Sequence, residues 1–105
     1  MSRNSPKSSA KTKTVPYDVA EQLRTPDEMA EYLDAWLTEA PEDASGIARA
    51  LGDIARAKGM SQVARDAGLS RESLYKALSE SGNPSFATVL KVAHALGVRL
   101  HAEAA

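Results

Sequence analysis

Cysteine is absent from the sequence, aromatic residues are scarce, and no long run of apolar residues occurs. Without cysteine the chain has no disulfides, thiolate nucleophiles or cysteine-ligated zinc sites, which is typical of a protein in a reducing cytoplasm. Aromatic residues make up 5% of the chain, so we expect a core of Ala, Leu, Val and Ile. No segment approaches the ~18 apolar residues of a membrane span, and no signal-peptide pattern follows Met1. These absences predict a soluble cytoplasmic protein that does not contact a membrane.

The 105 residues are enough for one small domain, and 26% of them are charged. The net charge of −1 conceals an uneven distribution along the chain. Residues 1–14 carry a net charge of +4, residues 15–45 carry −8, and residues 46–105 carry +3. We therefore expect parts of the surface to attract partners of different charge, although a skewed helix face is also common without such a partner.

The chain divides into three parts. Residues 1–14 hold almost no apolar side chains, which predicts a disordered basic tail. Residues 15–42 contain an extended piece followed by an acidic helix, and residues 43–105 contain the remaining helices and a C-terminal strand. The extended piece is indicated by apolar residues that alternate with polar residues or proline: Val15, Tyr17 and Val19.

The acidic helix has clear start and stop signals. Thr25 and Glu28 have the spacing of a capping box, and Pro41 ends the helix. An apolar stripe runs along one side and acids occupy the other. We expect Trp36 to anchor the core and Tyr32 to lie at the surface.

Four further helical segments follow, separated by glycine or proline. The first begins near Asp43 and ends at Gly59. Each of the others begins at a serine able to cap a helix and ends at or near a glycine. These three segments run from Ser61 to Gly68, from Ser70 to Gly82, and from Ser85 to Gly97. Residues 98–102 alternate apolar and polar side chains, which predicts a terminal β-strand on an all-α, five-helix domain.

The segment from Met60 to Ser79 has the residue pattern of a helix-turn-helix. Ala64 allows two helices to approach closely, and Gly68 supplies the positive φ of a sharp turn. The positions expected to face the core are Val63, Ala67, Leu69, Leu74 and Leu78. An ordinary helical hairpin has the same requirements, so the outward side of the second helix must distinguish the two.

That outward side is polar and able to hydrogen-bond, as expected of a helix in the DNA major groove. Arg71 has the planar guanidinium that reads guanine, and Tyr75 and Lys76 are able to contact phosphate. Ser61 and Gln62 stand at the start of the first helix, where phosphate commonly binds. The predicted DNA-binding residues are Ser61, Gln62, Ser70, Arg71, Glu72, Ser73, Tyr75 and Lys76.

The sequence offers no catalytic constellation. His94 and His101 lack a third metal ligand at a suitable spacing, and we predict no metal site and no cofactor. The serines stand at helix caps, and no glycine-rich phosphate loop of the P-loop or dinucleotide type is present. We therefore expect that the protein is not an enzyme.

Several stretches carry a family resemblance. They are most specific over residues 51–62 (LGDIARAKGMSQ) and 69–78 (LSRESLYKAL), and the whole match runs from about Tyr17 to Ala102. These stretches resemble the addiction-module antidote family, whose members are helix-turn-helix antitoxins of the Xre/HigA type with a lambda-repressor-like domain. The resemblance implies an antitoxin of a type II toxin–antitoxin module. Such a protein binds operator DNA as a homodimer, represses its own operon and neutralises a RelE/ParE-like toxin.

The acidic helix gives weaker, independent support for toxin binding, because an RNA-cleaving toxin presents a basic surface. The candidate toxin-binding residues are Glu28, Glu31, Tyr32 and Asp34. A solvated acidic face explains the same residues equally well. Two other functions stay open: a stand-alone prophage-type repressor without a toxin, and a protein-interaction module that uses the helix-turn-helix as a scaffold.

Overall fold

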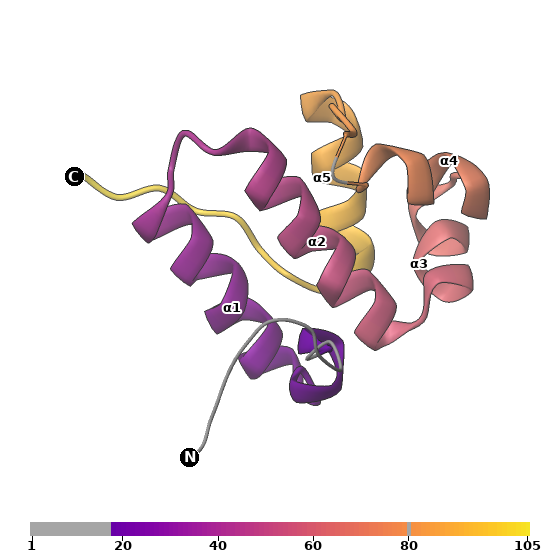
Figure 1. Cartoon of the computed structure of the whole chain (residues 1–105), viewed down its shortest axis with the longest axis horizontal. Coiled ribbons are helices and arrows are strands. Elements are labelled where there is room, and N and C mark those ends of the chain that lie inside the picture. The colour runs from indigo at the N-terminus through magenta and orange to yellow at the C-terminus, as the bar shows by residue number, and fades with distance from the viewer. Residues whose placement is uncertain (1–17, 80) are drawn as a thin grey trace, which may run out of the picture.

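The computed structural model of the protein describes residues 18–79 and 81–105. A short 3-10 helix, η1, precedes five α-helices, whose arrangement Figure 1 shows. Their bounds are η1 Val19–Gln22, α1 Pro26–Glu39, α2 Ala44–Lys58, α3 Met60–Ala67, α4 Arg71–Ala77 and α5 Phe86–Leu96. The all-helical, five-helix prediction is confirmed for the described residues. No helix among them is long and apolar enough to cross a bilayer.

Side-chain caps start most of the helices as the sequence predicts. Thr25 and Glu28 form both halves of the capping box, since each side chain accepts a hydrogen bond of 3.1 Å from the other residue's amide. Ser70 and Ser85 cap α4 and α5 by accepting from amides at 2.9 and 3.1 Å. The prediction of a cap at Ser61 is wrong, because α3 begins at Met60, one residue earlier.

The junction between α2 and α3 explains why Ser61 does not cap α3. Gly59 is both the C-cap of α2 and the N-cap of α3, and its φ is 116°. Its amide donates to Ala55 at 2.8 Å and its carbonyl accepts from Val63 at 3.0 Å. The positive φ lets a single glycine redirect the chain, so no separate capping residue stands between the helices.

The core is centred on α2, which packs against η1, α1, α3 and α5 (Figure 1). Leu51 and Ile54 of α2 are almost completely buried. The other helices contribute aliphatic side chains to the same cluster, and the largest of these fully buried residues are Val63, Leu74, Val92 and Leu96. The core is therefore aliphatic, as the scarcity of aromatic residues predicts.

Both aromatic residues of α1 are half-buried, and Tyr32 rather than Trp36 packs against the core cluster, which differs from the prediction. Tyr32 is half-buried and packs against the core cluster, and its hydroxyl donates a 2.6 Å hydrogen bond to Asp53. Trp36 lies half-buried at the side of α2, where its ring is next to Gly46 and 5.7 Å from the Arg49 guanidinium. One helical turn separates the two residues, so a small rotation of α1 about its axis decides which ring faces the core.

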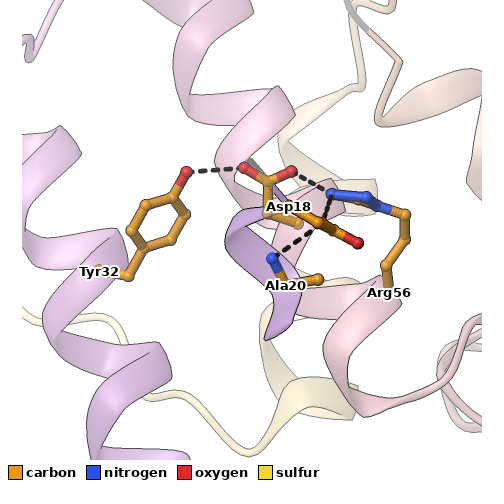
Figure 2. Close-up of polar contacts among 5 residues, drawn as sticks. Asp18, Ala20, Tyr32 and Arg56 are labelled. Atoms are coloured by element: carbon orange, nitrogen blue, oxygen red, sulfur yellow. Dashed lines mark hydrogen bonds and ion pairs between the residues drawn. The ribbon is translucent and has the colours of Figure 1, made fainter. Parts of the chain in front are cut away.

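Asp53 is the centre of a polar network that joins η1, α1 and α2. Figure 2 labels Tyr32, Arg56, Asp18 and Ala20 of this network. Besides accepting from Tyr32, its carboxylate accepts from the Arg56 guanidinium at 2.7 Å. Arg56 also contacts the Asp18 carboxylate at 3.4 Å, and Asp18 caps η1 through the amide of Ala20 at 3.1 Å. Burial raises the pKa of Tyr32, and the hydrogen bond to Asp53 raises it further.

We expect Tyr32→Phe to lower the free energy of unfolding by about 1 kcal/mol at neutral pH, because it removes the hydrogen bond to Asp53. The raised pKa means that the folded state holds the phenol proton more tightly than the unfolded state. This stabilisation is complete below the ordinary tyrosine pKa of about 10 and is lost as the pH rises above it. Urea denaturation from pH 7 to 11 should show a smaller difference between wild type and variant at alkaline pH. A difference that grows above pH 10 would contradict this assignment.

Both ends of the domain differ from the prediction. Val19 lies in η1 rather than in an extended piece, while Val15, Tyr17 and the basic tail of residues 1–14 fall outside the described residues. The predicted strand over residues 98–102 is absent, and residues 18–79 and 81–105 contain no β-strand. A strand needs a partner for its ladder, whereas Val98, Arg99, Leu100, His101 and Glu103 line a hollow together with α1. Figure 1 shows the C-terminal segment as an extended trace without a neighbouring strand.

Candidate nucleic-acid interface

The segment predicted as a helix-turn-helix consists of α3, a three-residue turn and α4. Val63, Ala64 and Ala67 are buried on the inner side of α3, and Leu74 and Leu78 are buried on the α4 side. Ala64 is 3% exposed, in keeping with its predicted role as the small residue at the helix contact. The pattern of inward positions is therefore confirmed, with Leu69 half-buried against the same cluster.

The turn is closed by main-chain hydrogen bonds. Gly68 has φ of 72° and ψ of 30°, in the left-handed helical region, as predicted. Its amide donates to Arg65 at 3.1 Å, and the Leu69 amide donates to Ala64 at 2.9 Å. These bonds satisfy carbonyl groups at the end of α3, while Leu69 packs on the core. The turn therefore fixes the direction in which α4 leaves α3.

We expect Gly68→Ala to lower the free energy of unfolding by about 1–2 kcal/mol through backbone strain alone. A Cβ at this position meets no atom within 4 Å, so no steric contact adds to the cost. Thermal denaturation followed by circular dichroism would measure the loss. A variant as stable as the wild type would show that the left-handed conformation is not required at this turn.

Helix α4 is shorter than predicted because the chain turns inward after its second turn. The helix ends at Ala77, and Leu78 caps it, whereas the sequence predicts an end near Gly82. Leu78 is 4% exposed, and its amide donates to Leu74 at 3.1 Å. Leu74 and Leu78 together hold one side of α4 against the core, which leaves the other side in solvent.

All eight predicted DNA-binding residues are exposed: Ser61, Gln62, Ser70, Arg71, Glu72, Ser73, Tyr75 and Lys76. Tyr75 is 66% exposed, so its ring stands in solvent beside the charged groups of α4. No described residue forms an ion pair with Arg71. The outward side of α4 thus presents a guanidinium, an ammonium and a phenol from one short helix.

Three of these residues already make local hydrogen bonds. The Ser70 hydroxyl accepts from the Ser73 amide and donates to the Ser73 hydroxyl at 2.8 Å, so Ser70 holds the start of α4. The Gln62 amide group donates to Asp66 at 2.9 Å and accepts from Arg65 at 2.9 Å. Ser61 and Gln62 lie in the first turn of α3 and not before it, which places Gln62 in a fixed orientation on the exposed side.

A hollow of about 340 Å³ beside α4 reveals residues that sequence reasoning did not assign to this surface. Arg49 and Arg56 of α2 line it together with Tyr75 and Ser79 from the α4 side. From the sequence alone, Arg56 is only a cation near the end of α2, where the helix dipole favours it. Its place in the sequence gives no indication that it lies near Tyr75. The candidate interface therefore borders α2, where Asp53 also lines the hollow and forms an ion pair with Arg56.

The candidate toxin-binding residues divide into two pairs. The Glu28 carboxylate accepts a 2.8 Å hydrogen bond from the Arg24 amide, forms a 3.4 Å ion pair with the Arg24 side chain and belongs to the capping box. These contacts hold the pKa of the Glu28 carboxyl below its ordinary value. Tyr32 donates to Asp53 within the fold. Glu31 and Asp34 are exposed and line the hollow of about 420 Å³ between α1 and residues 98–103. Only this second pair is available to a partner without breaking a contact in the fold.

No group of three or more His, Cys, Asp or Glu side chains within residues 18–79 and 81–105 is arranged to hold a metal ion. His94 and His101 are both exposed and belong to different parts of the chain, α5 and the C-terminal segment.

Comparison with known proteins places this arrangement in a family. The profile of a family described as "probable addiction module antidote protein" matches residues 13–104. An uncharacterized protein of Haemophilus influenzae is 54% identical over 87 residues, which span 83% of this chain and 88% of that protein. No solved structure gives a significant match. Family membership implies a toxin partner of some kind. The chain belongs to the family of probable addiction module antidote proteins.

Proposed function

We propose that the protein is an antitoxin of the Xre/HigA type that binds operator DNA by placing α4 in the major groove. The observation that carries the proposal is the outward side of α4, where Arg71, Tyr75 and Lys76 are exposed while Leu74 fixes the opposite side in the core. The α3–turn–α4 unit then acts as the helix-turn-helix of a lambda-repressor-like domain. Such units place the second helix in the groove with its first residues towards the base edges.

In this proposal Arg71 contacts a base, and the other side chains contact phosphates. Arg71 stands at the first position of α4, where its guanidinium reaches a guanine edge through two parallel hydrogen bonds. Lys76 and Tyr75, one turn later, contact phosphate. Ser61 and Gln62 contact phosphate from the start of α3, supported by the main-chain amides of its first turn. Affinity then comes mainly from phosphate contacts and discrimination from Arg71.

Operator recognition requires two copies of α4. A homodimer places them about one turn of DNA apart, ~34 Å, on a site with twofold symmetry. The dimer represses its own operon by occupying that site. A dimer also allows so small a domain to distinguish its operator from other DNA sequences, since each copy contributes its own base contacts.

The toxin partner is proposed to be a basic, RelE/ParE-like protein. Glu31 and Asp34 on α1 offer exposed acidic groups beside the hollow formed with residues 98–103. In Figure 1 α1 lies at the opposite side of the molecule from α4, so the two surfaces are separate. A toxin on α1 therefore leaves α4 accessible to DNA. Because the family is an antidote family, the antitoxin is favoured over a stand-alone repressor.

Fluorescence anisotropy with the DNA upstream of the protein's own gene tests operator binding. We expect this duplex to bind at least about 1,000-fold more tightly than a shuffled duplex of the same length and composition at the same salt concentration. Equal affinity for the two duplexes would contradict specific recognition and would favour an interaction module that uses the helices as a scaffold. Co-purification with the product of the adjacent gene tests toxin binding, and a stand-alone repressor would purify alone.

The basic tail provides a further prediction. Residues 1–14 carry a net charge of +4, and deleting them is expected to reduce the salt dependence of DNA affinity without changing the melting temperature. The slope of log affinity against log salt concentration should become shallower by up to about 4, one for each cation that contacts phosphate. An unchanged slope would remove the tail from the DNA contact. A lower melting temperature would contradict the prediction that the tail is not part of the fold.

A further inference from the structure

The segment that follows α5 is extended, and its main-chain groups have no partner among the described residues (Figure 1). Residues 99–105 make no main-chain hydrogen bond with residues 18–79 or 81–105. Val98 anchors the start of the segment, because its side chain packs against the core cluster and its amide donates to Ala93 at 3.0 Å. From Arg99 onwards, the amides and carbonyls that a β-ladder would use are therefore left to solvent.

The residues of this segment nevertheless have the pattern of a β-strand. Apolar and polar side chains alternate from Val98 to Glu103, which is the usual length of a strand. A strand whose main-chain groups are exposed is a template for pairing with a segment of another chain. The alternation and the exposed main chain together indicate a strand that lacks its neighbour.

A hollow beside the segment gives such a neighbour room. It has a volume of about 420 Å³ and lies between α1 and the C-terminal segment. Leu37 of α1 and Leu100 of the segment line it, and these large apolar side chains are 40% and 38% exposed. A strand in this hollow would cover both side chains while its main chain pairs with the segment.

The charged side chains around the hollow favour a basic partner. Three exposed carboxylates line it, those of Glu31, Asp34 and Glu103, together with one guanidinium, that of Arg99. None of the three carboxylates forms an ion pair with another residue in the part of the chain that the structure describes. A strand with cationic side chains therefore complements this hollow, whereas a second copy of the same chain would bring further carboxylates to it.

We propose that residues 98–103 bind the toxin by main-chain pairing, with an edge strand of the basic toxin lying in the hollow beside α1. The inference rests on the proposed function, which supplies the toxin as the partner. Main-chain hydrogen bonds provide affinity, while Leu37, Leu100 and the carboxylates of α1 select the side chains of the toxin strand. A helix cannot take the place of this strand, because its main-chain groups are already hydrogen-bonded to one another.

Amide hydrogen exchange of the full chain, followed by NMR with and without the purified product of the adjacent gene, tests the pairing. In the free protein all amides of residues 99–103 should exchange rapidly. In the complex every second one of these amides should be protected at least about tenfold, because only alternate residues of a strand point their amides at the neighbouring strand.

Proline substitutions at two adjacent positions provide a matched pair. Leu100→Pro and His101→Pro each remove one amide, and these two amides point to opposite edges of the segment. Neither amide is bonded within the described chain, so both variants should keep the wild-type melting temperature. One proline should weaken toxin binding at least about tenfold relative to alanine at the same position, while the other should match its alanine control.

Toxin binding without alternating protection, or equal effects of the two prolines relative to their alanine controls, would overturn the inference and leave the proposed toxin partner in place. An adjacent gene product that does not bind the wild type would contradict the toxin partner and the inference together, without bearing on operator binding. Alternating protection in the free protein that increases with protein concentration would assign the segment to a second copy, and would also overturn the inference.

Discussion

Replacing Leu74 by Ala is expected to lower the free energy of unfolding by about 2–5 kcal/mol, the largest stability effect of any single truncation on α4. Leu74 is completely buried and belongs to the central core cluster. Truncation removes its apolar contacts and leaves a cavity between α4 and the rest of the domain, which closes only in part. A small domain has a total stability of about 5–15 kcal/mol, so this loss brings it close to unfolding.

Tyr75→Ala is the matched control, because Tyr75 is the next residue of the same helix and is 66% exposed. Its effect on stability should stay within about 0.5 kcal/mol. Urea denaturation followed by far-ultraviolet circular dichroism measures both variants. Equal effects from the two truncations would contradict the orientation of α4, because they would mean that Leu74 is no more buried than Tyr75.

Arg71→Ala is expected to raise the dissociation constant for the operator about 5- to 150-fold, which corresponds to about 1–3 kcal/mol. The same change should relax the base preference at one position of the site, because Arg71 is assigned to a guanine edge. Arg71 is exposed and has no ion-pair partner among the described residues, so its removal should not affect folding. Competition binding against duplexes with single-base changes measures both effects.

Arg99→Ala is the control for charge alone. Arg99 is exposed in the C-terminal segment and lines the hollow with α1, away from α4. It changes the net charge by the same amount but should alter affinity less than about threefold, since long-range steering is weak at physiological salt. Lys76→Ala should weaken binding to all duplexes alike, as expected for a phosphate contact. If Arg71→Ala leaves affinity nearly unchanged, as expected for Arg99→Ala, or weakens binding to all duplexes alike, as expected for Lys76→Ala, then Arg71 does not read a base.

Local signals in the sequence were sufficient to predict most helix boundaries. The capping box at Thr25, the serine caps at Ser70 and Ser85, and the left-handed glycine at Gly68 all depend on contacts within a few residues. Such contacts follow from residue type and spacing. The inward positions of α3 and α4 were predictable for the same reason, because helical periodicity fixes which side chains share a side.

Features that depend on packing between distant segments were not predictable in this way. The choice between Tyr32 and Trp36 as the core aromatic depends on how α1 rotates against α2, and Asp53, the partner of Tyr32, is 21 residues away. The alternation in residues 98–102 predicts a strand, but a strand forms only where another segment supplies its ladder. The proximity of Arg56 to Tyr75 likewise follows only from the packing of the helices.

The candidate site shows the same division. The sequence identified the polar side of α4, because periodicity alone separates Leu74 from its exposed neighbours. It also nominated Glu28 and Tyr32 for toxin binding, although their side chains hold contacts within the fold. Charge and position along α1 do not distinguish them from Glu31 and Asp34, which remain exposed. Which of the four residues are exposed follows only from the contacts that each side chain makes in the folded chain.

Titration of ¹⁵N-labelled full-length protein with the upstream duplex tests the central claim most directly. Amide resonances should shift most at Ser61 and Gln62 and over residues 70–76, while those of α1 should shift little. Matched titration with a shuffled duplex should require far more DNA to produce any change. Shifts concentrated on α1 and residues 98–103, with the α4 resonances unmoved at saturation, would contradict the assignment of α4 to the DNA.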